Sequence, residues 1–207
     1  MDLIELGLRI WNKLPQADSN LEEVPSYTYS MASAPQIRLI SSWSEVTEQL
    51  AAHWDGILQS SSYPSVFQTW DYLDAWCQHA GDHVSPHVLV MEEDGKPLAL
   101  APLALGPMEV AGRPWLRQLT FLGCINLALS EYLDFLIPEG REEELLPHFL
   151  EHLAESAKGQ WDVLSLPLMR EGGPCTALLR KLIPSTLGVD MEPVKTEPSP
   201  YATLPET

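Results

Sequence analysis

A long apolar hairpin pattern, from residue 87 to residue 105, most constrains how this chain can fold. The run 87–91 is almost wholly apolar, a charged turn containing Gly95 follows, and a second apolar run extends over 97–105. Apolar runs of this length beside such a turn are typical of two antiparallel strands in a sheet that is buried on both faces. Because every segment with a helical pattern lies outside this block, we expect a central sheet covered by helices.

The remaining elements follow from periodicity and from breaker residues. Pro102 cannot donate a hydrogen bond to a ladder, so we expect a bulge or an edge position there. Pro147 should kink its helix or mark a late start. We predict helices over 42–58, where Ser42 and Glu45 form a capping-box pattern, and over 70–80, 139–158 and 176–182. We predict further strands over 36–40, 116–122, 132–137, 161–166 and 189–194.

Charge and cysteine content exclude several classes of function. The chain has 207 residues, of which 29 are acidic and 12 basic, and its formal net charge is -17. Such a charge repels phosphate backbones, so nucleic acids and anionic membranes are poor partners. Its three cysteines are far apart and form no C-x-x-C pair, which indicates neither a disulfide framework nor a zinc site and fits a reducing cytoplasm.

The chain divides into three parts. Residues 1–35 are expected to form an amphipathic helix over 1–14 and a flexible linker, 36–196 a single domain, and 197–207 a tail. The helix either docks in a partner's groove or folds back on its own domain. It lacks the basic start and unbroken apolar centre of an export signal, and we expect no transmembrane segment.

Local motifs do not define an active site. His148 and His152 have metal-ligand spacing, but they lie opposite the apolar stripe of their helix and the H-E-x-x-H order is absent, so we expect a solvated acidic face and no metal. Cys124 has no nearby base and an acidic neighbour, which does not favour a thiolate nucleophile. The apolar loop 123–130 is expected either to bind a ligand or to be covered by a neighbour.

Several segments in order nevertheless resemble the first half of the FemAB-like and CelD-like acyltransferases. These form a branch of the GNAT superfamily that includes proteins linked to cellulose biosynthesis. The resemblance covers about residues 36–205. It rests on Val66-Phe67-Gln68-Thr69-Trp70 with Leu73 and Ala75-Trp76, on Pro97-Leu98-Ala99-Leu100-Ala101-Pro102-Leu103, on Phe121-Leu122-Gly123, on Ser130-Glu131-Tyr132-Leu133-Asp134-Phe135, on Trp161-Asp162-Val163-Leu164, and on Ser199-Pro200-Tyr201 with Leu204-Pro205.

The resemblance implies a GNAT-like α/β (α+β) fold, with a mixed, mainly antiparallel central sheet and helices on both faces. Such proteins look like tandem duplications, in which two domains face each other across a substrate groove and acyl-donor chemistry belongs mainly to the second. This chain departs from the pattern at Glu131, where Asp is more usual, and at Thr207, where the second domain would begin. The candidates for the groove, each equally expected to be structural, are Gln68, Trp70, Glu131, Tyr132 and Asp134.

The position of a GNAT donor loop is occupied by an acidic turn. A pyrophosphate needs consecutive backbone N–H groups in a glycine-rich loop at a helix N-terminus. Here the turn 138–143 has Gly140 as its one glycine and three carboxylates. We therefore expect neither coenzyme A nor aminoacyl-tRNA to bind this chain, with acyl-CoA entering only with a second domain.

The functional expectation is accordingly the non-catalytic N-terminal half of a cytoplasmic acyltransferase. It would help to shape an acceptor groove and would need a second domain or a partner chain. The alternative is a degenerate GNAT-like interaction module that recruits a partner through the loop 124–129 and the N-terminal helix. A complete small acetyltransferase is the third possibility, and it lacks a donor loop.

Overall fold

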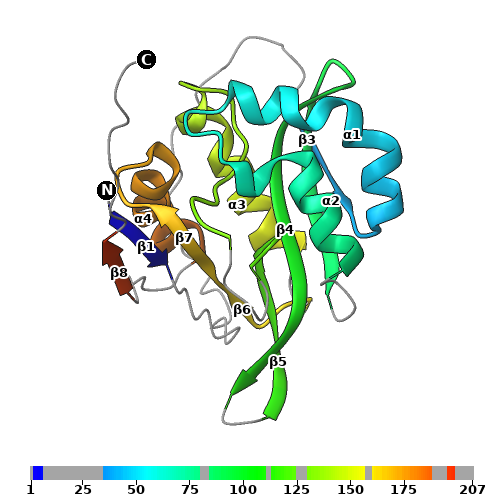
Figure 1. Ribbon diagram of the computed structural model, residues 1–207. Helices are drawn as coiled ribbons and strands as arrows, with labels where there is room; N and C mark the ends of the chain where they lie inside the picture. Colours follow the sequence, from blue (N-terminus) through cyan, green and yellow to red (C-terminus); the bar gives the residue numbers. More distant parts are fainter. Residues whose placement is uncertain are drawn as a thin grey trace, which may run out of the picture.

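A five-stranded sheet with the strand order β2-β3-β4-β5-β6 forms the centre of the protein, seen here in a computed structural model (Figure 1). The structure describes residues 2–6, 35–79, 84–110, 113–124, 130–156, 160–187 and 195–198. The first four strands of the five-stranded sheet are antiparallel neighbours, and β5 and β6 are parallel. The strands of this sheet are β2 (Gln36–Ile40), β3 (Ser85–Glu93), β4 (Lys96–Val110), β5 (Arg113–Phe121) and β6 (Val163–Leu164).

The predicted hairpin is the β3–β4 pair. Its turn residues Asp94 and Gly95 both have positive φ, 51° and 73°. Two such residues in succession are typical of the type I′ turn, whose twist matches that of paired strands. The hairpin is therefore fixed by local turn chemistry as well as by its apolar runs.

Alternate side chains of the hairpin enter two separate cores. Leu89 and Met91 join the core beneath α3 and α4, whereas Val88 and Val90 join the core beneath α1 and α2. The expected mixed, mainly antiparallel sheet with helices on both faces is thus confirmed. The helices are α1 (Trp43–Ser60), the 3₁₀ helix η1 (Val66–Gln68), α2 (Trp70–His79), α3 (Glu142–Ser156) and α4 (Pro174–Leu187).

Pro102 lies inside the central strand β4. The hydrogen-bond ladder between β4 and β5 ends at Pro102, and no bulge forms there. Its carbonyl accepts a hydrogen bond from Leu122 N–H at 2.8 Å, but as a proline it has no N–H to return. Two residues earlier, Leu100 exchanges two backbone hydrogen bonds of 2.9 Å with Leu136. The chain between Leu122 and Leu136 therefore leaves and rejoins the same edge of β4 at adjacent bonding positions.

A buried serine links the start of this excursion to its middle. Ser130 Oγ donates to the Gly123 carbonyl at 2.9 Å and lies 2.9 Å from the Tyr72 hydroxyl. Gly123 has a φ of +88°, and a Cβ there would lie 2.8 Å from Ser130 Oγ. Only glycine fits this conformation and this close approach.

The N-terminal residues differ from the prediction. Residues 2–6 form the strand β1 (Asp2–Leu6), where we expected a helix, because β7 and β8 offer it backbone partners on both sides. This three-stranded sheet, with the order β7-β1-β8, lies beside α4 in Figure 1. Its other strands are β7 (Leu166–Arg170) and β8 (Lys195–Pro198). The rest of the predicted helix and the linker lie outside the described residues.

Other element boundaries also changed. The predicted strand 132–137 is wrong, since the one β-bridge within it is the isolated bridge at Leu136. Ser42 is the N-cap of α1, but its side chain makes no capping hydrogen bond. Pro147 lies within α3, and α4 is longer than expected, with Pro184 inside it. The predicted strand 189–194 lies outside the described residues.

Within the part of the chain that the structure describes, no helix combines the length and the apolar character needed to cross a bilayer.

The buried His87 should make stability depend on pH. Burial and the neighbouring His152 lower the pKa of His87 to about 4. Between pH 4 and 6.5 the unfolded state therefore binds more protons, and the free energy of unfolding falls as the pH falls. When the pH is lowered from 7.5 to 5.5, the free energy of unfolding measured in urea should fall by about 1 kcal/mol less in His87→Leu than in the unsubstituted protein. The control is His53→Leu at an exposed position, and equal losses in all three proteins would refute this role for His87.

Candidate functional site

The excursion from β4 carries three of the five predicted groove residues and is held in place by η1. Gln68, which is 1% exposed, donates from Nε2 to the Asp134 carbonyl at 2.7 Å and accepts from Asp134 N–H at 3.2 Å. Ser65 Oγ also donates to the Glu131 carbonyl at 3.1 Å. Both backbone groups of Asp134 are thus bound by one side chain, so this segment cannot also form a regular ladder. Gln68 thus supports the segment through its side chain.

Tyr132 has a left-handed backbone, which is uncommon for a bulky residue. Its φ is +57°, and Leu168 on the facing strand β7 has a φ of +58°. The two segments are joined by a hydrogen bond of 3.3 Å from Leu133 N–H to the Leu168 carbonyl. Such conformations cost about 1–3 kcal/mol each and cluster at functional sites.

The Tyr132 ring is one of two tyrosine rings that lie against the Arg170 guanidinium. The Arg170 guanidinium lies 4.3 Å from the centroid of the Tyr63 ring and 5.4 Å from that of Tyr132. Both distances are within the range of cation–π attraction, which orients a guanidinium over an aromatic face. Tyr63 comes from the loop after α1, so this cluster joins three segments that are distant in sequence.

Beside this cluster, the Asp134 carboxyl group lines a cavity of about 10 Å³, the size of one water molecule. Ser62, Glu142 and Cys175 line the same cavity. Glu142 is 6% exposed, and its Oε1 accepts a hydrogen bond from Ser62 Oγ. Two carboxyl groups and a thiol from separate elements thus meet at a site with almost no room for solvent.

These surroundings shift the acidity of the groups. Burial, assisted by the negative charge of Glu142, raises the pKa of Asp134 to about 7, although hydrogen bonds from Phe135 N–H and Cys175 oppose the change. Burial and the neighbouring Asp134 raise the pKa of the Cys175 thiol, which therefore stays protonated and is a poor nucleophile. At neutral pH, Asp134 is then the group here able to take up or release a proton.

The fifth candidate, Trp70, lies in a tryptophan cluster instead. Its ring stacks on Trp43, with centroids 5.2 Å apart and planes 7° from parallel, and meets Trp54 edge-on. Glu131 remains partly exposed beside Tyr132. The structure thus brings together Glu131, Tyr132 and Asp134.

Sequence reasoning missed the partners of these residues. Glu142 was interpreted as one of the three carboxylates of the turn before its helix, and Cys175 had no motif around it. Arg170 offered a usable signal, because a cation between an apolar run and a Gly-Gly turn is unusual in so acidic a chain. Ser62 and Tyr63 lie in a Ser-rich loop whose pattern does not indicate contact with residues some 70–110 positions away.

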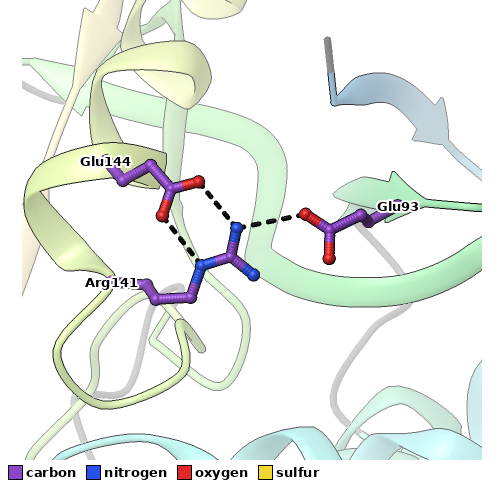
Figure 2. A network of polar contacts seen from close by, with 3 residues as sticks. All are labelled: Glu93, Arg141 and Glu144. Atoms are coloured by element: carbon purple, nitrogen blue, oxygen red, sulfur yellow. Dashed lines mark hydrogen bonds and ion pairs between the residues drawn. The ribbon is translucent and has the colours of Figure 1, made fainter. Parts of the chain in front are cut away.

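The turn before α3 was the expected donor-loop position. Arg141 is its one basic residue, and Figure 2 shows this guanidinium between two carboxylates. Its Nη2 lies 2.6 Å from Glu144 Oε1 and 3.1 Å from Glu93 Oε1. The hydrogen bonds to Glu144 and Glu93 raise the pKa of Arg141, and the hydrogen bond between Arg141 and Glu144 lowers the pKa of Glu144. The positive charge of Arg141 is therefore already balanced by these two carboxylates.

Among the described residues, no three His, Cys, Asp or Glu side chains are grouped so as to hold a metal ion. His148 contacts Glu151 at 3.5 Å on the surface of α3.

Comparisons with protein-family models, with curated proteins and with solved structures found no match for this chain.

Asp134 should oppose folding at alkaline pH. Since its pKa is about 7 in the folded state and about 4 when unfolded, stability from this group is lost as the pH rises from 4 to 7. Asp134→Asn keeps the acceptor for Phe135 N–H but does not ionise. We compare the free energy of unfolding in urea of Asp134→Asn with that of the unsubstituted protein. The difference in favour of Asp134→Asn should be about 1–2 kcal/mol greater at pH 8 than at pH 5.5. The exposed substitution Asp71→Asn is the control, and a relative stability of Asp134→Asn that does not change with pH would contradict the assignment.

Proposed function

We propose that this chain is the N-terminal, non-catalytic half of a GNAT/FemAB-like acyltransferase and forms one wall of its acceptor groove. A second domain, in the same polypeptide or on a partner chain, would hold the acyl donor. The proposal rests on the sequence resemblance, on the mixed sheet with helices on both faces, and on the chemistry of the excursion from β4.

The observation that carries the acceptor role is the strained Tyr132 beside Asp134. A left-handed tyrosine is retained only where the surroundings hold it firmly, and here it places an aromatic ring against Arg170 and Tyr63. Aromatic faces with one planar cation suit a polar acceptor that has both hydroxyl groups and apolar faces, such as a sugar.

The charge of the turn before α3 supports the assignment of the donor to another domain. Glu139 and Glu143 are exposed there, Glu142 is buried, and Arg141 is held by Glu93 and Glu144. A diphosphate at Gly140 would meet uncompensated negative charge, and at 4 Å each pair of like charges costs about 1–4 kcal/mol.

The alternative, an interaction module, has less support. Residues 2–6 of its proposed docking helix form a strand between β7 and β8. Of the other segment that it needs, the loop 124–129, residues 125–129 lie outside the described residues.

Two titrations test the proposal on this chain. In calorimetry with acetyl-CoA at about 100 μM we expect no binding heat, because the carboxylates around Gly140 repel the diphosphate. In saturation-transfer NMR with cellobiose as a model acceptor, we expect a signal that is lost in Tyr132→Ala and in Tyr63→Ala.

The control is Tyr72→Phe, which keeps the ring and lies at Ser130 instead of Arg170. Micromolar binding of acetyl-CoA with turnover would refute the non-catalytic half. Absence of a cellobiose signal, or a signal equal in Tyr132→Ala, would refute the sugar-binding wall.

A further inference from the structure

The loop after α1 lines the cavity that holds the Asp134 carboxyl group. Ser61, Ser62 and Tyr63 border this cavity together with Asp134 and Glu142. Tyr63 is 39% exposed and is the only exposed residue among the described residues that line the cavity, whereas Glu142 is 6% exposed. The loop is therefore the wall between this cavity and solvent.

The tip of this loop is anchored on both sides. Before it, Ser61 forms an isolated bridge with Pro138. After it, Ser65 Oγ donates to the Glu131 carbonyl at 3.1 Å. Between these anchors lie residues 62–64, which we call the cover. The cover can therefore move without disturbing the helices α1 and η1.

Two side-chain contacts hold the cover closed. Ser62 Oγ donates to Glu142 Oε1, and the Arg170 guanidinium lies 4.3 Å from the centroid of the Tyr63 ring. Tyr63 thus borders the carboxyl groups and also belongs to the cation cluster with Tyr132. A change within the cavity reaches Arg170 through this one ring.

The closed cavity cannot solvate two carboxylate ions. Its volume of about 10 Å³ admits one water molecule, and like charges that share such a site oppose each other's ionisation. Glu142 has the better support for a negative charge, since it lies in the first turn of α3 and accepts a hydrogen bond from Ser62. The proton of the pair therefore resides on Asp134 while the cover is closed.

The groups on the surrounding elements leave this proton as the one that is lost near neutral pH. Burial raises the pKa of Asp134 to about 7, and the charge of Glu142 contributes to the rise. On α4, burial raises the pKa of the Cys175 thiol, which stays neutral. On β7 the charged side chain is Arg170, and η1 contributes the neutral Gln68. Raising the pH through 7 therefore adds one negative charge inside the cavity.

We propose that the cover is a proton-operated switch on the Asp134–Glu142 pair, closed while the pair holds one proton and lifted once that proton has passed to water. A second negative charge in the cavity needs solvent, and the cover is the wall that can admit it. Lifting the cover takes the Tyr63 ring away from Arg170. The switch is independent of the acyltransferase assignment, but its consequence rests on the proposed function, because the lifted cover removes one aromatic face from the acceptor wall.

The Arg170 δ-methylene protons report the position of the cover in ¹H–¹³C NMR, because the adjacent Tyr63 ring shifts their signals. Between pH 6 and 8.5 we expect these signals to move to the position that they have in Tyr63→Leu, with a midpoint near pH 7. Asp134→Asn keeps the acceptor for Phe135 N–H but does not ionise. In this variant the Arg170 signals should stay at their pH 6 position throughout.

A matched pair of substitutions in the first turn of α3 tests the role of Glu142. Glu142→Gln keeps an acceptor for Ser62 but removes the charge, and should lower the midpoint by about 1 pH unit. The control Glu143→Gln removes the same charge at an exposed position and should leave the midpoint unchanged. If Asp134→Asn does not fold, this pair still tests the switch.

These measurements contain no ligand, so their failure is distinguishable from failure of the cellobiose titration. Arg170 signals that stay at their pH 6 position up to pH 8.5 in the unsubstituted protein would overturn the switch. The same titration in Asp134→Asn, or equal midpoints in Glu142→Gln and Glu143→Gln, would overturn the assignment of the proton to the Asp134–Glu142 pair.

Discussion

The missing amide hydrogen of Pro102 is the constraint on which the arrangement of the candidate site depends. β4 is the central strand of the sheet, and its ladder with β5 ends where Pro102 accepts from Leu122 and cannot donate. The next bonding position on that edge, Leu100, is taken by Leu136. The chain between these two points is therefore anchored to the sheet at both ends. Its residues 130–135 lie outside the sheet ladders and place Tyr132 and Asp134 beside β7 and α4.

The sequence predicted those parts of the fold that local chemistry determines. The β3–β4 hairpin follows from two apolar runs and an Asp-Gly turn, and α1 and α3 follow from their apolar stripes. Residues 2–6 and 132–137 were predicted wrongly because their backbone partners are distant in sequence: β7 and β8 pair with the first, and Gln68 binds the second. The same distinction between local and distant partners applies to the candidate site. Tyr132 and Asp134 could be nominated from a motif, but Glu142, Cys175 and Arg170 meet them only through the tertiary fold.

The strongly acidic composition has a structural counterpart in how the arginines are placed. Arg38 pairs with Glu92, Arg117 with Asp162, and Arg141 with Glu93 and Glu144. These pairs are largely at the surface and contribute little to stability, about 0–1 kcal/mol each. Their effect on recognition is larger, because they neutralise cations that an anionic ligand would need. Arg170 is placed differently, against the faces of two tyrosines.

Hydrogen exchange of the Asp134 amide tests most directly whether the Gln68 side chain holds the excursion in place of a strand ladder. The comparison is between the unsubstituted protein and Gln68→Ala, with the Leu100 and Leu136 amides, which bond to each other, as internal references. We expect the Asp134 amide to exchange about 10-fold faster or more in Gln68→Ala, while the two reference amides keep their protection. Equal protection of Asp134 in both proteins would contradict the account.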